Sequence, residues 1–182
     1  AKSRRPNVEE KERMKQLIRD GMDAGACGLS TQYLGEGSMQ RDYDGTPMVT
    51  DLLNFDDLLD FSAILKEKGR GTFQGNGTNM EQAVQLMERS GANYIYNAVC
   101  LECDQHGVKT DNWREWLQFT KDCNARGLRL TPQTMVVGTD YEFTFDDNWS
   151  LFDADETWCT ICSGSTAEKI KKMNDPKNRE KL

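Results

Sequence analysis

The chain has 182 residues, a formal net charge of −7 and a pI of about 4.9, and its acidic residues are spread along the sequence. This balance argues against a nucleic-acid-binding surface, which is normally basic. There is no run of about 18 apolar residues, which excludes a membrane-spanning helix, and no apolar segment follows the basic start as it would in a secretory signal.

The first predicted helix covers residues 8–24, begins after the cap residue Asn7 and ends at Gly25. Its apolar stripe is expected to face the core and consists of Met14, Leu17, Ile18 and Met22. A short strand over Ala26–Ser30 follows, and the sequence then turns polar at once. A helix that leads into a buried strand with a polar carboxyl end is the repeating unit of parallel α/β folds.

A long polar segment, residues 32–51, follows this strand and is rich in Gly, Asp and Ser. Loops of about this length are uncommon in compact domains and are usually functional or disordered. Because the segment comes directly after a strand end and carries Asp42, Tyr43 and Asp44 beside glycines, we expect it to fold over a binding site as a lid.

Three further helix–glycine–strand units follow. The helices are predicted over Phe55–Lys68, Met80–Ser90 and Trp113–Ala125, and the strands over Gly71–Gln74, Asn93–Leu101 and Leu128–Val137. Four such units in a row predict an α/β fold with one parallel sheet. Residues 1–137 are therefore assigned to the parallel units, and residues 138–182 to an irregular, aromatic-rich lobe and a terminal helical stretch, Thr166–Leu182, of the same domain.

Polar side chains occupy the later positions of all four predicted strands, where buried parallel strands normally carry Val, Ile and Leu. The candidate binding residues are Ser30, Thr31, Gln74, Asn76, Asn97 and Gln133. If the sheet curves into a barrel, these side chains converge on one rim. The alternative is that each one merely satisfies backbone groups at a strand end. The repetition over four strands favours a shared ligand site.

Other chemical signals are weaker. The pairs Cys100/Cys103 and Cys159/Cys162 have the spacing of zinc ligands, but 55 residues separate them, far more than the 15–20 or so that are usual in a zinc ribbon. Incidental free thiols in a reducing, cytoplasmic environment are therefore favoured over a shared zinc site. His106, in a polar segment between a strand and a helix, is read as a loop residue rather than as a base or ligand.

Several segments resemble, in order, the N-acyl-D-amino-acid deacylases of the metal-dependent amidohydrolase superfamily. They include DAGACGLST (residues 23–31), DGTP (44–47), GRGTFQ (69–74), TPQ (131–133) and NDPKNR (174–179). The resemblance implies a TIM-type (β/α)8 barrel, of which this chain supplies the fourth to seventh strands. It also implies hydrolysis of an amide bond, in an N-acyl amino acid or related compound, by a zinc-activated water.

The resemblance also implies where the catalytic groups lie. The His-x-His of the family's first strand and the Asp of its last strand fall outside this chain, and its fifth- and sixth-strand histidines correspond to positions near Asn76 and Asn97 or Ala98. Gln74, Asn76, Asn97 and Gln133 are then expected to line the substrate side, with the principal zinc ligands outside the chain. The alternative is a non-catalytic amidohydrolase-like subunit, or a binding or scaffolding protein, that has lost the metal centre.

A closed barrel has eight strands and typically about 250 residues. Four strands leave two open sheet edges, so we expect the remaining strands to come from a longer parent chain or a partner chain. Apolar strand residues are expected to lack a facing layer in the chain alone, namely Ile95, Val99, Leu128 and Leu130. Expressed alone, the chain is expected to aggregate or to be loosely packed.

Overall fold

The structure is a computed structural model that describes residues 4–36, 38, 42, 46–100, 108–136, 142, 144–146 and 155–182. The chain divides into two compact units. The sheet unit comprises residues 1–34 and 53–138, and the C-terminal unit comprises residues 35–52 and 139–182. The predicted boundary at residue 137 lies close to the end of the sheet unit, but the segment 35–52, predicted as a loop of the first part, groups with the C-terminal residues.

The sheet unit contains four helices, α1 (Val8–Asp23), α2 (Phe55–Lys68), α3 (Met80–Ser90) and α4 (Asn112–Ala125). Polar side chains cap three of them, because Asn7, Asn54 and Asn79 accept hydrogen bonds from backbone N–H groups of the first turns. Asp111, the predicted cap of α4, makes no such bond; its carboxylate instead accepts from the Arg114 guanidinium at 3.1 Å.

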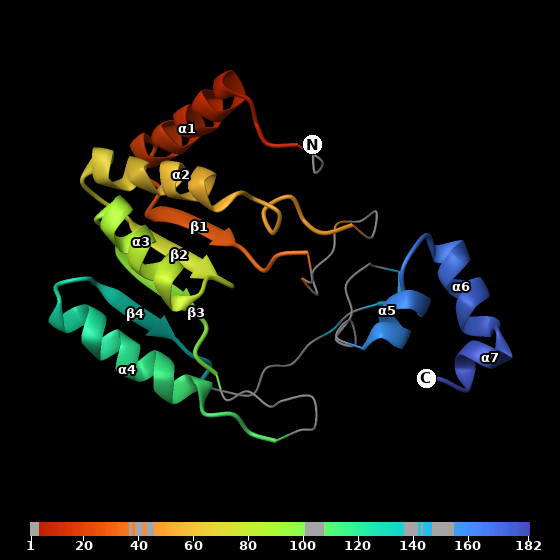
Figure 1. Cartoon of the computed structure of the whole chain (residues 1–182). Coiled ribbons are helices and arrows are strands. Elements are labelled where there is room, and N and C mark those ends of the chain that lie inside the picture. The colour runs from red at the N-terminus through yellow and green to blue at the C-terminus, as the bar shows by residue number, and fades with distance from the viewer. Residues whose placement is uncertain are drawn as a thin grey trace. The chain divides into compact units, whose positions relative to one another are not determined.

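The four strands are β1 (Gly28–Gln32), β2 (Thr72–Asn76), β3 (Asn93–Asn97) and β4 (Leu130–Gln133). They form one parallel sheet in the order β1-β2-β3-β4, so each strand pairs with the strand before it in the sequence (Figure 1). The predicted parallel α/β sheet is thus confirmed, although β1 lies two residues later than predicted and β3 and β4 are shorter. A four-stranded sheet of this order is compatible with part of a (β/α)8 barrel.

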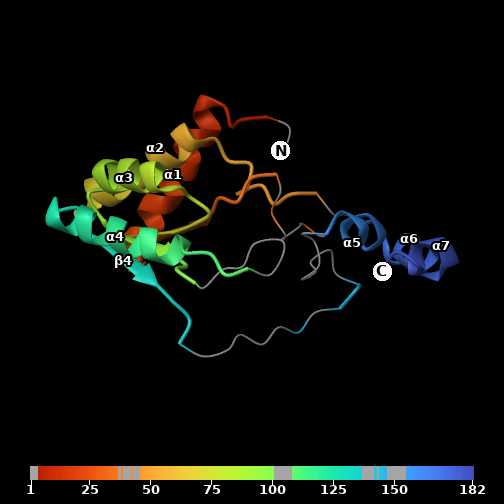
Figure 2. The ribbon, with the colours of Figure 1, turned by 60° about the horizontal axis from the view of Figure 1, so that its bottom comes forward.

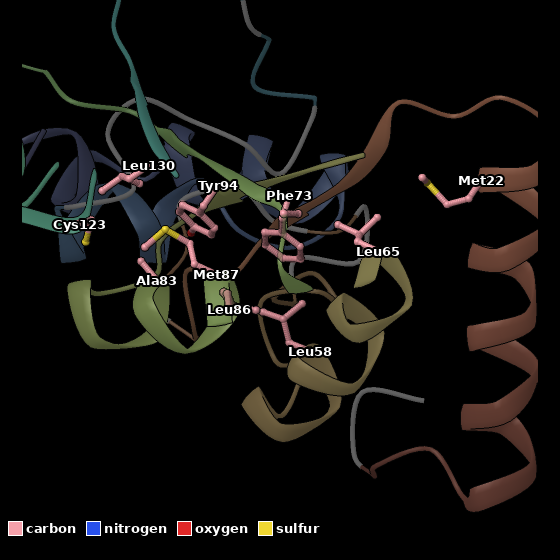
Figure 3. Packing of buried hydrophobic residues seen from close by; sticks show 11 residues of the cluster. Met22, Leu58, Leu65, Phe73, Ala83, Leu86, Met87, Tyr94, Cys123 and Leu130 are labelled. Carbon is pink, nitrogen blue, oxygen red and sulfur yellow. The ribbon is translucent and has the colours of Figure 1, made fainter. Parts of the chain in front are cut away.

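One face of the sheet carries the helices. Phe73, Tyr94 and Leu130 extend from the strands into a cluster that α1, α2, α3 and α4 complete (Figure 3). The helix side chains of this cluster are Met22, Leu58, Leu65, Ala83, Leu86, Met87 and Cys123. Figure 2 shows the same helices from a second direction. Since residues from all four helices pack against one side of the strands, the helical layer lies on a single face.

Burial corrects two sequence expectations, each at two residues. Met14 and Leu17, predicted to face the core from α1, are 39% and 65% exposed. Leu130 and Val99 were expected to lack a facing layer, yet they are 3% and 8% exposed. Leu130 belongs to the cluster that includes Cys123 of α4, so its apolar surface is covered by the helix that precedes its own strand.

A charged network ties the first three helices together. The Arg5 guanidinium donates to the buried Asp57 carboxylate at 2.8 Å, and the Lys11 amine lies 2.7 Å from both Asp57 and Asp60. Arg89 of α3 reaches Asp60 at 3.4 Å. The hydrogen bond from Arg5, together with the Lys11 amine, holds the pKa of Asp57 below its ordinary value despite burial.

The C-terminal unit contains α5 (Glu156–Ile161), α6 (Thr166–Asn174) and α7 (Pro176–Arg179). The prediction missed α5, which begins where the Asp155 carboxylate accepts from two backbone N–H groups. The predicted terminal helix is two helices, since Asp175 is extended and Pro176 starts the second one. Lys172 donates to the carbonyls of Thr160 and Ser163 at the end of α5, at 3.0 and 2.8 Å.

Among the described residues, no helix has the length and apolar character that a membrane crossing requires.

Candidate ligand-binding face

The second face of the sheet is polar. Side chains alternate between the two faces along a strand, and paired positions of neighbouring strands share a face. Phe73, Tyr94 and Leu130 occupy paired positions and point to the helices, so the positions between them point the other way. Five of the six candidate residues share this second face and are called the polar row here: Ser30, Gln74, Asn76, Asn97 and Gln133.

Thr31 is the exception. It pairs with Gly75, whose neighbour in the register is Tyr96, and it lies two residues from both Leu29 and Tyr33, which pack against the core. Thr31 therefore lies on the face that carries the helices, where its hydroxyl donates to the Gln32 carbonyl at 3.3 Å. Adjacent residues of a strand cannot share a face, so the sequence could have indicated that Ser30 and Thr31 do not act together.

Gln74 lies at the centre of the polar row. The Ser30 hydroxyl donates to the Gln74 side-chain oxygen at 3.2 Å. The Gln74 side-chain nitrogen in turn donates to the Gln133 side-chain oxygen at 3.0 Å. These two bonds connect β1, β2 and β4 and pass over Ile95, the residue of β3 that pairs with Gln74. The amide of Gln74 is thereby held in one orientation.

Hydrogen-bonding capacity remains along the row. In the part of the chain that the structure describes, the side-chain nitrogen of Gln133 donates no hydrogen bond, and the side chains of Asn76 and Asn97 make none. An amide offers two N–H donors and one oxygen acceptor. The row therefore presents both donors and acceptors, and Ser30 and Gln133 are exposed.

The row carries no acid, base or thiol. All five of its side chains are hydroxyl or amide groups, which stay neutral at ordinary pH. Four more polar residues of the same face were not singled out as site residues, namely Gln32, Thr72, Asn93 and Thr131. The Thr131 hydroxyl donates to the Asn93 side-chain oxygen at 3.1 Å. This arrangement suits recognition of a neutral polar ligand and supplies no group for proton transfer.

The donor set does not fit zinc, whose protein ligands are Cys, His, Asp and Glu. The described residues contain no cluster of three or more such side chains. Cys103, His106, Tyr43 and Asp44 lie outside the described residues. Cys159 and Cys162, one of the two ligand-like pairs, are not joined in a disulfide. The expectation that the principal zinc ligands lie outside this chain stays a prediction.

A cavity of about 320 Å³ lies at the carboxyl ends of β3 and β4 and the start of α4, on the side of the sheet that carries the helices. Its lining consists of Val99, Cys100, Trp113, Leu117, Pro132 and Thr134. Sequence reasoning missed this cavity, although Trp113 at the first turn of a helix, close to a strand end, was an available signal.

Nearby, the Tyr96 ring stacks on Trp116 with 3.5 Å between the ring centroids, and Phe119 meets Trp116 edge to face. These rings fix the position of α4 against the end of β3. The wall of the cavity is thus built on packed elements of the sheet unit.

When compared with models of protein families, with curated proteins and with solved structures, the chain gives no match. The resemblance to the deacylases therefore rests on the segments quoted from the sequence.

Proposed function

We propose that the polar row is the substrate-binding face of an amidohydrolase-type hydrolase, of which this chain forms a portion. The substrate is an N-acyl amino acid or a related amide. The observation that carries the proposal is the hydrogen-bonded series that runs from Ser30 and Gln74, in the middle of β1 and β2, to Gln133 at the carboxyl end of β4. Ligands of parallel α/β folds bind at this end of the strands.

An amide substrate matches the chemistry of the row. Its carbonyl accepts and its N–H donates, and the row offers side-chain amides that do both. The bonds from Ser30 and to Gln133 hold the central Gln74 amide before any ligand arrives, so less ordering is required on binding. The neutrality of the row means that the groups which activate water come from outside these residues.

The second candidate is a binding subunit without catalytic activity. The absence of acidic, basic and thiol groups from the polar row favours it, because such a face recognises a ligand without reacting with it. Both candidates require amide binding at the row, and they differ in turnover alone.

Binding is tested by calorimetry with the full chain, using N-acetyl-D-alanine and free D-alanine as probes. Only the first contains the amide, so we expect it to bind more tightly. Gln74→Leu removes both hydrogen bonds of Gln74 and should weaken binding of the amide by about tenfold. Gln118→Leu is the matched control, because Gln118 is exposed on α4 and donates to Asp122.

Unchanged affinity in the Gln74 variant would contradict binding at the row. Release of D-alanine from the N-acetyl compound, measured with added Zn²⁺ on the longest natural polypeptide that contains the chain, separates the two candidates. Turnover supports the hydrolase, and tight binding without turnover supports the binding subunit.

A further inference from the structure

We infer that the ligand of the polar face is an N-acyl peptide with several amide groups in succession, rather than an N-acyl amino acid with one. The inference deepens the proposed function, on which the identity of the ligand as an acyl amide rests, by naming the class of amide. It starts from the last residue of each strand. All four of these residues carry a side-chain carboxamide and are called the carboxamide line here: Gln32, Asn76, Asn97 and Gln133.

The register of the sheet places these side chains side by side. Gln32 pairs with Asn76, and Asn97 pairs with Gln133. The pairing of β2 with β3 continues up to the residues just before Asn76 and Asn97, so these two side chains are also neighbours. Because paired positions of neighbouring strands share a face, the line runs across the polar face at the carboxyl ends of the strands, where the arrowheads lie in Figure 1.

Bonds within the protein do not account for the carboxamide line. In the part of the chain that the structure describes, the side chains of Asn76 and Asn97 make no hydrogen bond, and the Gln133 side-chain nitrogen donates none. A carboxamide that only satisfied backbone groups at a strand end would be bonded to them. Asn76 and Asn97 are half-buried, so the donors and acceptors at the ends of β2 and β3 remain accessible to a ligand.

The length of the line exceeds what a single amide group can use. Neighbouring strands lie about 4.8 Å apart, so four carboxamides, one on each strand, span about 14 Å. An extended chain advances about 3.4 Å per residue, so an acyl group and one amino acid cover about half of this distance. An acyl group followed by three amino acids covers all of it.

The chemistry of the line matches a peptide backbone. Each side-chain carboxamide has two N–H donors and one oxygen acceptor, and each peptide group has one donor and one acceptor. A peptide that lies across the strand ends can therefore exchange hydrogen bonds with successive carboxamides. A charged group at the same place would require an ionic partner, which no member of the line supplies.

The test compares the binding of N-acetyl-D-alanine and N-acetyl-D-alanyl-D-alanyl-D-alanine to the full chain by calorimetry. The peptide should bind at least about tenfold more tightly, because it brings two further peptide groups to the line. Asn97→Leu removes one carboxamide, so it should lower this ratio of affinities by at least about threefold.

Asn93→Leu is the matched control. Asn93 lies on the same strand and face as Asn97, but at the amino end of β3, where its side chain accepts from Thr131. This variant should leave the ratio unchanged. Thermal unfolding checks that each variant folds, and Asn76→Leu, on the neighbouring strand, is the second variant if Asn97→Leu does not.

Equal affinities for the two compounds, or the same ratio in the native chain and in the folded variant of the line, would overturn the inference. The proposed function is judged by a different variant. If Gln74→Leu weakens the binding of N-acetyl-D-alanine but the peptide binds no more tightly, the proposed function stands and the inference falls. If Gln74→Leu has no effect but the peptide binds more tightly and depends on Asn97, the peptide site stands and the proposed function falls.

Discussion

At the scale of single residues, Gly75 shows how closely the sheet packs on its helical layer. A Cβ atom at this position would lie 1.9 Å from the Tyr94 hydroxyl oxygen. Tyr94 has no exposed surface, and its hydroxyl is hydrogen-bonded to Thr78. Burial raises the pKa of Tyr94 to about 12, so the ring stays neutral and cannot leave the core by ionising at ordinary pH.

Gly75→Ala should therefore destabilise the protein by about 2 kcal/mol, because Tyr94 must move out of a packed site. Gly21→Ala is the control: no atom lies within 4 Å of its added Cβ, and alanine in a helix interior should stabilise by about 0.5–1 kcal/mol. Urea unfolding measures both. Equal stabilities of the Gly75 variant and the native chain would show that Tyr94 is not fixed by this contact.

For single residues, the sequence indicated which polar side chains could lie close together, but it did not indicate on which face of the sheet each one lies. Ser30 and Gln74 were predicted to lie together, and in the structure the Ser30 hydroxyl donates a hydrogen bond to Gln74. Thr31 was included among the candidate residues, although it lies on the face that carries the helices. A short polar run at a strand end does not reveal which of its residues point to which face of the sheet. This assignment became visible only through the pairing of Phe73 with Tyr94.

At the scale of elements, helix ends were predictable and strand ends were not. The bounds of α2 and α3 agree with the prediction, because Asn54 and Asn79 cap their first turns and Gly69 and Gly91 end them in the left-handed conformation. These are local signals. Strand ends depend on hydrogen bonds to a neighbouring strand, which no local pattern encodes, and so β4 covers only part of the predicted range.

The network around Asp57 makes the docking of α1 on α2 sensitive to pH. The pKa of Asp57 is lowered in the folded protein, first by the hydrogen bond from Arg5 and also by Lys11. The ionised Asp57 carboxylate therefore stabilises the fold fully above the pKa that Asp57 has in the unfolded chain, about 3.9. This stabilisation is lost as the pH falls through the lower pKa that Asp57 has in the folded protein.

Asp57→Asn should cost about 3 kcal/mol at pH 7, because it leaves Lys11 and Arg5 without their buried partner. The deficit should shrink below about pH 4, where the native carboxylate also takes up a proton. Asp56→Asn, at an exposed neighbour, should cost less than about 1 kcal/mol. Urea unfolding at several pH values provides the measurement. A deficit that stays constant down to pH 2 would rule out the ionised Asp57 as its cause.

At the scale of the whole molecule, the sheet has two outer strands. Among the described residues, β1 pairs only with β2, and β4 pairs only with β3. Unpaired strand edges attract other chains.

Residues 1–182 expressed alone should therefore associate, as sedimentation velocity can show. Thr131→Lys, which places a charge on exposed β4, should reduce association. A soluble monomer with one cooperative unfolding transition would show that the four strands suffice, and the barrel assignment would then fall.

The order of the strands also bears on how the protein is made. Every strand pairs with the strand that was synthesised just before it, and each intervening helix packs beside its own strands. As the chain leaves the ribosome, β2 already finds β1 in place, and the same holds for β3 and β4. The sheet can therefore grow by one helix and one strand at a time, and no strand has to wait for a distant segment of the chain to be synthesised.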